Sequence, residues 1–151
     1  MVNRKYTDFI EFISNYPDLN IVEMDTVEGL QTESDCFLTL LWRKSKFMLI
    51  FKLESQTTEG VTRIFKTLQT LIPLDIYKNL FQVILTDNGH EFFDVNNIEC
   101  ILSTGEYVTH LFFVIHMYLV RKDQLKKIMN LLDIFYLKVL LSKILLKKAV
   151  I

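Results

Sequence analysis

The chain has 151 residues, 50% of them hydrophobic, and a formal net charge of −1. This length suits one domain, and the high apolar content with only four Gly and two Pro excludes a disordered chain. The two cysteines, Cys36 and Cys100, exclude a disulfide framework and have no metal-ligand spacing. A reducing cytosol fits best, and residues 1–10 lack the apolar core of a signal peptide, so we expect a cytoplasmic protein.

The charges are divided unevenly along the chain. Residues 121–151 contain eight of the 17 Lys and Arg residues but only two of the 18 Asp and Glu residues. The first 120 residues are therefore acidic and the last 31 are basic, which indicates two segments under different constraints. The simplest interpretation of the basic segment by itself is a solvated helix.

The first part of the chain predicts a helix followed by three strands. Residues 6–15 have apolar side chains at helical spacing, and Pro17 ends this helix. Residues 19–29 alternate as a strand does. Residues 36–42 and 46–53 are two further strands joined by a short basic turn, so the three strands form an antiparallel meander.

The period of the apolar residues then changes to that of a helix. Between Val61 and Leu71 they recur every three or four positions, which predicts an amphipathic helix that begins near Thr57 and ends at Pro73. Residues 81–86 are continuously apolar, as expected of a strand that is covered on both faces and runs parallel to its neighbour.

Two further elements complete the order. Residues 92–102 predict a short helix and residues 109–115 a fifth strand. Three antiparallel strands, a helix, a parallel strand, a helix and another strand make an α/β fold with a mixed five-stranded sheet. This is the order of the ribonuclease H-like fold.

Two acidic residues occupy neighbouring strands of such a sheet. Asp25 lies on the first strand, and Asp87 follows the fourth strand at its carboxyl end, where open α/β sheets gather their ligands. Adjacent carboxylates repel each other unless a cation lies between them. Mg²⁺ prefers oxygen ligands and assists phosphoryl transfer, so the pair suggests a site for divalent cations.

Structural explanations for these acids remain open. Asp87 precedes Asn88-Gly89 and is most often a turn former in such a position, whereas for Asp25 structure and function are evenly balanced. Glu28 and Glu91 are expected to be solvated. Three histidines share no spacing and are expected to be ordinary surface or core residues: His90, His110 and His116.

Three motifs then occur in order: "NIVEMDTVEG", "LLWRKSKFMLIFKLES" and "LTDNGHEFFD". Together they resemble the catalytic core of insertion sequence 30 family transposases, which belong to the DDE transposase and retroviral integrase group. The resemblance extends from Tyr6 to Phe113. It implies a ribonuclease H-like fold and a triad of two Asp and one Glu that binds Mg²⁺ or Mn²⁺. It also implies DNA as the partner, both as transposon ends and as target, with cleavage followed by strand transfer.

The resemblance assigns roles to individual residues. Asp25 in "EMDT" matches the first acid of the triad, and Asp87 in "TDNG" matches the second, so both are the implied catalytic residues and metal ligands. Glu91 matches an acid of the family's "DNG-x-E-F", which is outside the triad, and Asn88 belongs to the same motif; both are possible secondary site residues.

Two features depart from the family. The family's N-terminal helix-turn-helix region has no counterpart here, and the third acid is missing after Phe113. If residues 114–130 are read one base earlier in the coding DNA, a possible translation contains Asp-Pro-Tyr and then Glu-Lys-Asn, as the family does. We therefore infer a frameshift after Phe113, by which the codon for the third acid is read as Lys126.

The sequence thus predicts a truncated, frameshifted transposase core. Residues 1–18 form a helix leading into the core, 19–113 are the partial core, and 114–151 are a basic, apolar tail of helix-forming composition. The loss of one acid predicts little or no catalysis. An alternative is a non-catalytic protein that pairs with intact transposase, and the chain could also form homo-oligomers; no membrane partner is expected, because charges interrupt the apolar tail.

Overall fold

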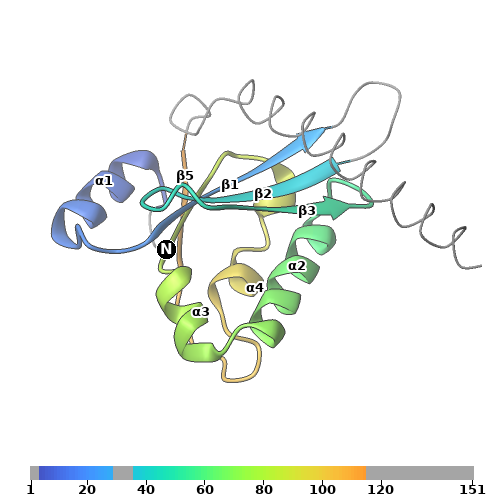
Figure 1. Cartoon of the computed structure of the whole chain (residues 1–151). Coiled ribbons are helices and arrows are strands. Elements are labelled where there is room, and N and C mark those ends of the chain that lie inside the picture. Colours follow the sequence, from blue (N-terminus) through green and yellow to red (C-terminus); the bar gives the residue numbers. More distant parts are fainter. Residues whose placement is uncertain (1–3, 29–35, 115–151) are drawn as a thin grey trace, which may run out of the picture. The chain divides into compact units, whose positions relative to one another are not determined.

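A computed structural model of the chain describes residues 4–28 and 36–114 (Figure 1). The order of elements is a helix, three strands, two helices, a strand, two short helices and a last strand. They are α1 (Tyr6–Asn15), β1 (Ile21–Glu28), β2 (Cys36–Trp42), β3 (Met48–Leu53), α2 (Thr58–Leu71), α3 (Leu74–Leu80), β4 (Val83–Thr86), the 3₁₀ helix η1 (His90–Phe92), α4 (Val95–Glu99) and β5 (His110–Phe113).

The strands form one five-stranded mixed sheet in the order β3-β2-β1-β4-β5. β1, β2 and β3 pair antiparallel as a meander. β4 pairs in parallel with β1, and β5 pairs in parallel with β4. The predicted α/β architecture, with three antiparallel strands followed by parallel ones, is confirmed.

Helices cover both faces of the sheet. On one face α2, α3 and α4 bury Phe65, Tyr77 and Ile98 against β1, β2 and β4. On the other face, α1 packs Phe9 against β4 and β5. Every residue of β4 is buried, which confirms the expectation of a strand covered on both sides. Burying one large apolar side chain contributes about 1.5–3 kcal/mol, so these two apolar layers hold the sheet in place.

The helical crossover between β3 and β4 contains one helix more than predicted. α2 begins after Thr57, whose side-chain oxygen accepts a hydrogen bond from the Gly60 N–H at 3.2 Å, and it ends just before Pro73, as expected. α3 then starts directly after Pro73. Its seven residues are too few to display a clear helical period, and sequence patterning therefore missed it.

Several element boundaries differ from the prediction: β1, β4 and β5 are each shorter than expected, and two further differences have a local cause. The strand expected from residue 46 begins at Met48, because Lys46 adopts a φ of 58° and extends the turn. The helix expected over 92–102 is divided into η1 and α4, with Asp94 capping α4. Burial alone would raise the pKa of Asp94, but hydrogen bonds from Asn97 and Thr62 hold it below its ordinary value.

The N-terminal segment is attached to the sheet by a buried ion pair. Arg4 forms a bidentate pair with Glu99 of α4 and donates a further hydrogen bond to the Leu111 carbonyl at 3.1 Å. The Glu99 carboxylate also accepts the Leu111 N–H at 2.7 Å. Arg4, α4 and β5 are thereby joined at one side of the sheet.

None of the helices within residues 4–28 and 36–114 has the length and apolar character needed to cross a membrane. The predicted tail lies outside the described residues, apart from Val114.

Candidate functional site

Asp25 occupies a central position of the sheet. It lies on β1, between β2 and β4, and its residue is only 4% exposed. Its backbone carbonyl accepts a hydrogen bond from the Thr39 side chain of β2 at 3.1 Å. A buried carboxylate in the middle of a sheet is costly unless the surroundings or a ligand compensate its charge.

Asp87 follows β4 directly and begins a turn. Its Oδ1 accepts a hydrogen bond from the Gly89 N–H at 3.0 Å, the arrangement of an Asx turn, so the structural role expected of Asp-Asn-Gly is present. The side chain is half-buried, whereas Asn88 beside it is exposed. A role as a turn former does not exclude a second role for the other carboxylate oxygen.

The register of the sheet relates the positions of these two acids to the last β1–β4 pair. β1 and β4 run in parallel, and the last pair of their ladder is Glu23 with Leu85. Two residues further along each strand stand Asp25 and Asp87. Because side chains alternate along a strand, Asp25 faces the same side of the sheet as Glu23, whereas Asp87 stands after the end of β4, where the Asx turn holds it.

β1 contains a second buried acid, on the same face as Asp25, that sequence reasoning did not single out. Glu23, two residues before Asp25 on β1, is 7% exposed and forms an ion pair with Arg43. The Arg43 guanidinium also lies 5.8 Å from the ring centre of Phe9. The position of Glu23 within an apolar strand was the sequence signal that could have identified it, since glutamate is depleted in strands.

The expectation that Glu91 is solvated is wrong. Glu91 lies on η1 and is 5% exposed, because this turn folds back and directs the side chain toward β1. Its Oε1 accepts hydrogen bonds from the Thr26 hydroxyl and from the Gln56 side-chain amide, the latter at 2.6 Å. Neither Thr26 nor Gln56 was predicted to contribute to the site, because their contact with Glu91 depends on a loop that spacing does not reveal.

The remaining predicted residues fall into two groups. His90 and His110 are exposed, as expected of ordinary surface residues. Three others lie outside the described side chains and are not placed: Glu28, His116 and Lys126.

The carboxylate pair fits a single divalent cation in its chemistry. Asp25 and Asp87 supply hard oxygen ligands from adjacent strands, and Mg²⁺ is commonly held by one or two carboxylates together with water and substrate phosphates. Among residues 4–28 and 36–114, no three His, Cys, Asp or Glu side chains gather closely enough to hold a metal ion. The residues present therefore suit one weakly held ion rather than the two-ion site of a complete triad.

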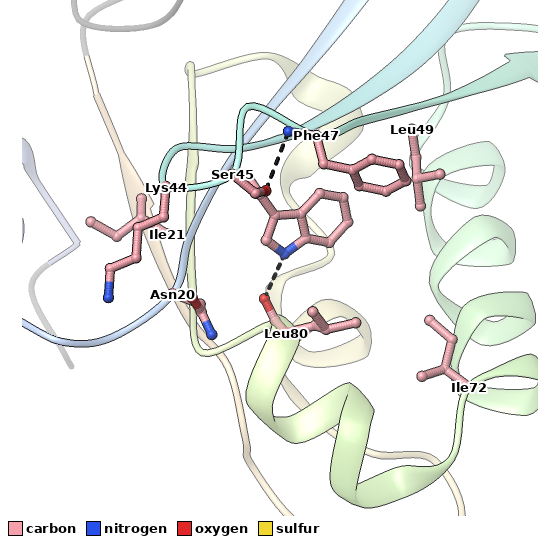
Figure 2. Close-up of a pocket in the computed structure, with 9 residues that line it drawn as sticks. Asn20, Ile21, Lys44, Ser45, Phe47, Leu49, Ile72 and Leu80 are labelled. Atoms are coloured by element: carbon pink, nitrogen blue, oxygen red, sulfur yellow. Dashed lines mark hydrogen bonds between the residues drawn. The ribbon is translucent and has the colours of Figure 1, made fainter.

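A separate cavity lies at the opposite end of the sheet, where β1 begins and β2 ends (Figure 2). It has a volume of about 560 Å³ and is lined mainly by apolar side chains. Trp42 donates its indole N–H to the Leu80 carbonyl at 3.0 Å and so contributes a fixed wall. Phe47 of the β2–β3 turn is 56% exposed at the same place. Figure 2 shows Phe47 and Leu49 on one side of the cavity, with Ile72 and Leu80 across from them.

The fold and the site define an α/β protein with one acid in the middle of β1 and a second directly after the neighbouring parallel strand β4. Comparison of this chain with protein-family models and with curated proteins gave no match.

Proposed function

We propose that this chain is a partial catalytic core of a DDE-type transposase, similar to the insertion sequence 30 family, with a ribonuclease H-like fold and little or no catalytic activity. The strand order β3-β2-β1-β4-β5 supports the proposal, because it follows from the element order expected for that fold. The three sequence motifs also support the proposal. One lies in β1, one in the β2–β3 hairpin and one at the end of β4.

One observation carries the proposal: the parallel β1–β4 ladder ends at Glu23 and Leu85, and Asp25 and Asp87 each stand two residues beyond that last pair. The resemblance implies that these two acids act together, although they are 62 positions apart in the sequence. Patterning of apolar residues does not require an acid at either position. Their equal offset from the last pair of the ladder is therefore support that does not depend on the motifs.

Asp25 and Asp87 are the residues that would hold a Mg²⁺ or Mn²⁺ ion. The ion, when bound, would supply the Lewis acidity needed for attack on a phosphodiester. The chain itself positions the two ligands. The sheet fixes Asp25, and the Asx turn fixes Asp87 through the hydrogen bond that one of its two carboxylate oxygens accepts.

The weak activity follows from the missing third acid. With two carboxylates in place of three, the negative charge that attracts the ions is reduced and a second ion lacks its ligands. Lys126, at the position implied for that acid, has a charge of the wrong sign.

Cleavage of DNA tests the proposal directly. The full chain is incubated with Mn²⁺ and a duplex that contains the terminal repeats of an insertion sequence 30 family element, beside Asp87→Ala. We expect no strand cleavage above the level of the variant. Turnover in the wild-type chain that disappears in Asp87→Ala would overturn the prediction of inactivity, although it would support the assignment of the site.

The coding DNA tests the inferred frameshift. Sequencing through the codons for Thr109 to Ile151 is expected to reveal an uninterrupted second frame that encodes Asp-Pro-Tyr and then Glu-Lys-Asn. A second frame interrupted by stop codons would mean that the tail is genuine, and the search for a third acid would then reopen.

A second candidate function is supported by the apolar cavity. Phe47 lines the apolar cavity and is 56% exposed, and exposed apolar side chains of this kind often mark interaction surfaces. A non-catalytic protein that pairs with intact transposase would need such a surface. Pull-down with an intact relative should weaken in Phe47→Ser but not in Tyr107→Ser, which alters a side chain that is 63% exposed elsewhere. Equal binding by both variants would exclude this surface.

A further inference from the structure

We propose that Glu91 is a positioning residue, whose buried carboxylate joins the turn after β4 to β1 and so fixes Asp87 relative to Asp25. The inference rests on the proposed function, because it concerns the same carboxylate pair. It assigns to Glu91 a role that neither the motif nor its expected solvation indicated.

The hydrogen bonds of Glu91 connect three separate segments of the chain. Thr26 belongs to β1 and is 4% exposed, and its hydroxyl donates to the Glu91 Oε1. Gln56 belongs to the loop between β3 and α2, and its amide donates to the same oxygen at 2.6 Å and to the Thr26 hydroxyl at 2.7 Å. The carboxylate therefore stands at the centre of a network that joins segments 65 and 35 positions away in the sequence.

The Glu91 carboxylate also lies close to Gly89, in the turn that holds Asp87. A Cβ added at Gly89 would lie 2.5 Å from the Glu91 Oε2 and 2.9 Å from Oε1, so a larger residue at this position would displace the carboxylate. The N–H of the same glycine is the donor to Asp87. The Glu91 carboxylate thus packs against Gly89, the residue whose N–H closes the Asx turn of Asp87.

The two ends of the network adjoin the two proposed ligands. Thr26 is the neighbour of Asp25 on β1, and because side chains alternate, it faces the opposite side of the sheet. Glu91 is four positions after Asp87, at the other end of the same turn. The hydrogen bond between Thr26 and Glu91 therefore sets the distance between the backbone of β1 and the turn after β4, and with it the separation of the two proposed ligands.

A direct role of Glu91 as a third metal ligand has no support in the geometry. Its Oε1 already accepts two hydrogen bonds, and no cluster of three potential metal-binding side chains occurs in the part of the chain that the structure describes. Residues that orient metal ligands without contacting the metal commonly change metal affinity about 10–100-fold when they are replaced.

Binding of Mn²⁺ to the full chain tests the inference without any need for catalysis. The free Mn²⁺ signal is followed by electron paramagnetic resonance during titration. Thr26→Val removes the hydroxyl without altering size or charge, and we expect it to weaken Mn²⁺ binding about 10-fold. Thr26→Ser retains the hydroxyl and should bind within about twofold of the wild-type chain. Gln56→Ala changes an exposed loop residue, so it tests the network even if Thr26→Val folds poorly.

A second readout follows the turn itself. In the metal-free protein, the NMR signal of the Gly89 amide reports the hydrogen bond to Asp87. We expect it to move in Thr26→Val and Gln56→Ala but not in Thr26→Ser. Glu99→Gln serves as the matched control, because it alters another buried acid, held by Arg4, that has no part in this network. It should leave both Mn²⁺ affinity and the Gly89 signal unchanged.

The outcomes separate this inference from the proposed function. If Asp25→Asn abolishes Mn²⁺ binding while Thr26→Val and Gln56→Ala bind as the wild-type chain does, the positioning role is refuted and the metal site survives. If the wild-type chain binds no Mn²⁺, or Asp25→Asn binds it equally well, the proposed site is refuted and the inference falls with it. Weaker binding by Thr26→Val and Gln56→Ala, with an unchanged control, supports both.

Discussion

Replacement of Asp25 by asparagine is expected to stabilise the metal-free protein. The substitution keeps the shape of the side chain and removes one of two neighbouring negative charges. Adjacent strands lie about 4.8 Å apart, so carboxylates on facing positions come within about 5 Å of each other. Two unit charges at about 5 Å repel by about 3 kcal/mol at an effective dielectric constant of about 20. Asp87 is half-buried and salt screens the pair, so we expect a gain of about 1–2 kcal/mol.

Urea unfolding, followed by the fluorescence of the single tryptophan, measures this gain. In a thermal experiment it corresponds to a rise in Tm of about 2–8 °C. A double-mutant cycle with Asp87→Asn isolates the repulsion, because each single substitution removes one of the two charges and thereby the same pairwise interaction. Mg²⁺ at about ten times its Kd should stabilise the wild-type chain by about 1.4 kcal/mol, and this effect should vanish in Asp25→Asn.

The opposite sign would refute the reasoning. If Asp25→Asn lowers the free energy of unfolding by 1 kcal/mol or more, roughly the net contribution of one hydrogen bond, Asp25 is a structural acid whose interactions outweigh the repulsion. A coupling energy near zero in the cycle would mean that Asp25 and Asp87 do not act on each other. Either result removes the observation on which the proposed function depends.

Three further substitutions test the fold around the site. Burial raises the pKa of Tyr77 to about 12 from 10.0, so only the unfolded chain loses the phenol proton as the pH rises from 10. The free energy of unfolding should therefore fall by about 2 kcal/mol between pH 9 and about 11.5, relative to Tyr77→Phe in urea unfolding. Gly89→Ala should cost about 1–3 kcal/mol because of the clash with Glu91, and unchanged stability in thermal unfolding would contradict that contact. Arg4→Ala leaves Glu99 buried without its arginine and should cost about 2–4 kcal/mol, and faster amide exchange at Leu111 reports the loss of its contact with Arg4.

Apolar periodicity was sufficient to predict most of the sheet. β2 was predicted with its observed limits, from Cys36 to Trp42, because both ends are marked by polar residues. The parallel placement of β4 followed from its continuously apolar sequence, and the structure confirms that all four of its residues are buried. Failures occurred where local conformation rather than patterning decides, as at Lys46, whose positive φ delays the start of β3.

The site was predicted less completely than the fold. Asp25 and Asp87 could be placed on adjacent strands, because strand order follows from the sequence of elements and the register follows from alternation. The burial of Glu91 could not be predicted in this way. It depends on η1 folding back toward Thr26 and on the position of Gln56, and both are consequences of loop geometry.

The residues that position the carboxylate pair all precede the inferred frameshift. Asp25 is fixed by β1, Asp87 by the Asx turn after β4, and the network of Glu91 involves Thr26 and Gln56. The last strand of the parallel part of the sheet is also formed before that point, since β5 ends at Phe113. A change of reading frame after Phe113 would therefore remove the third acid without displacing the first two. On this reasoning, the loss of catalysis and the loss of metal binding are separable, and we expect the chain to retain a weak but measurable affinity for Mn²⁺.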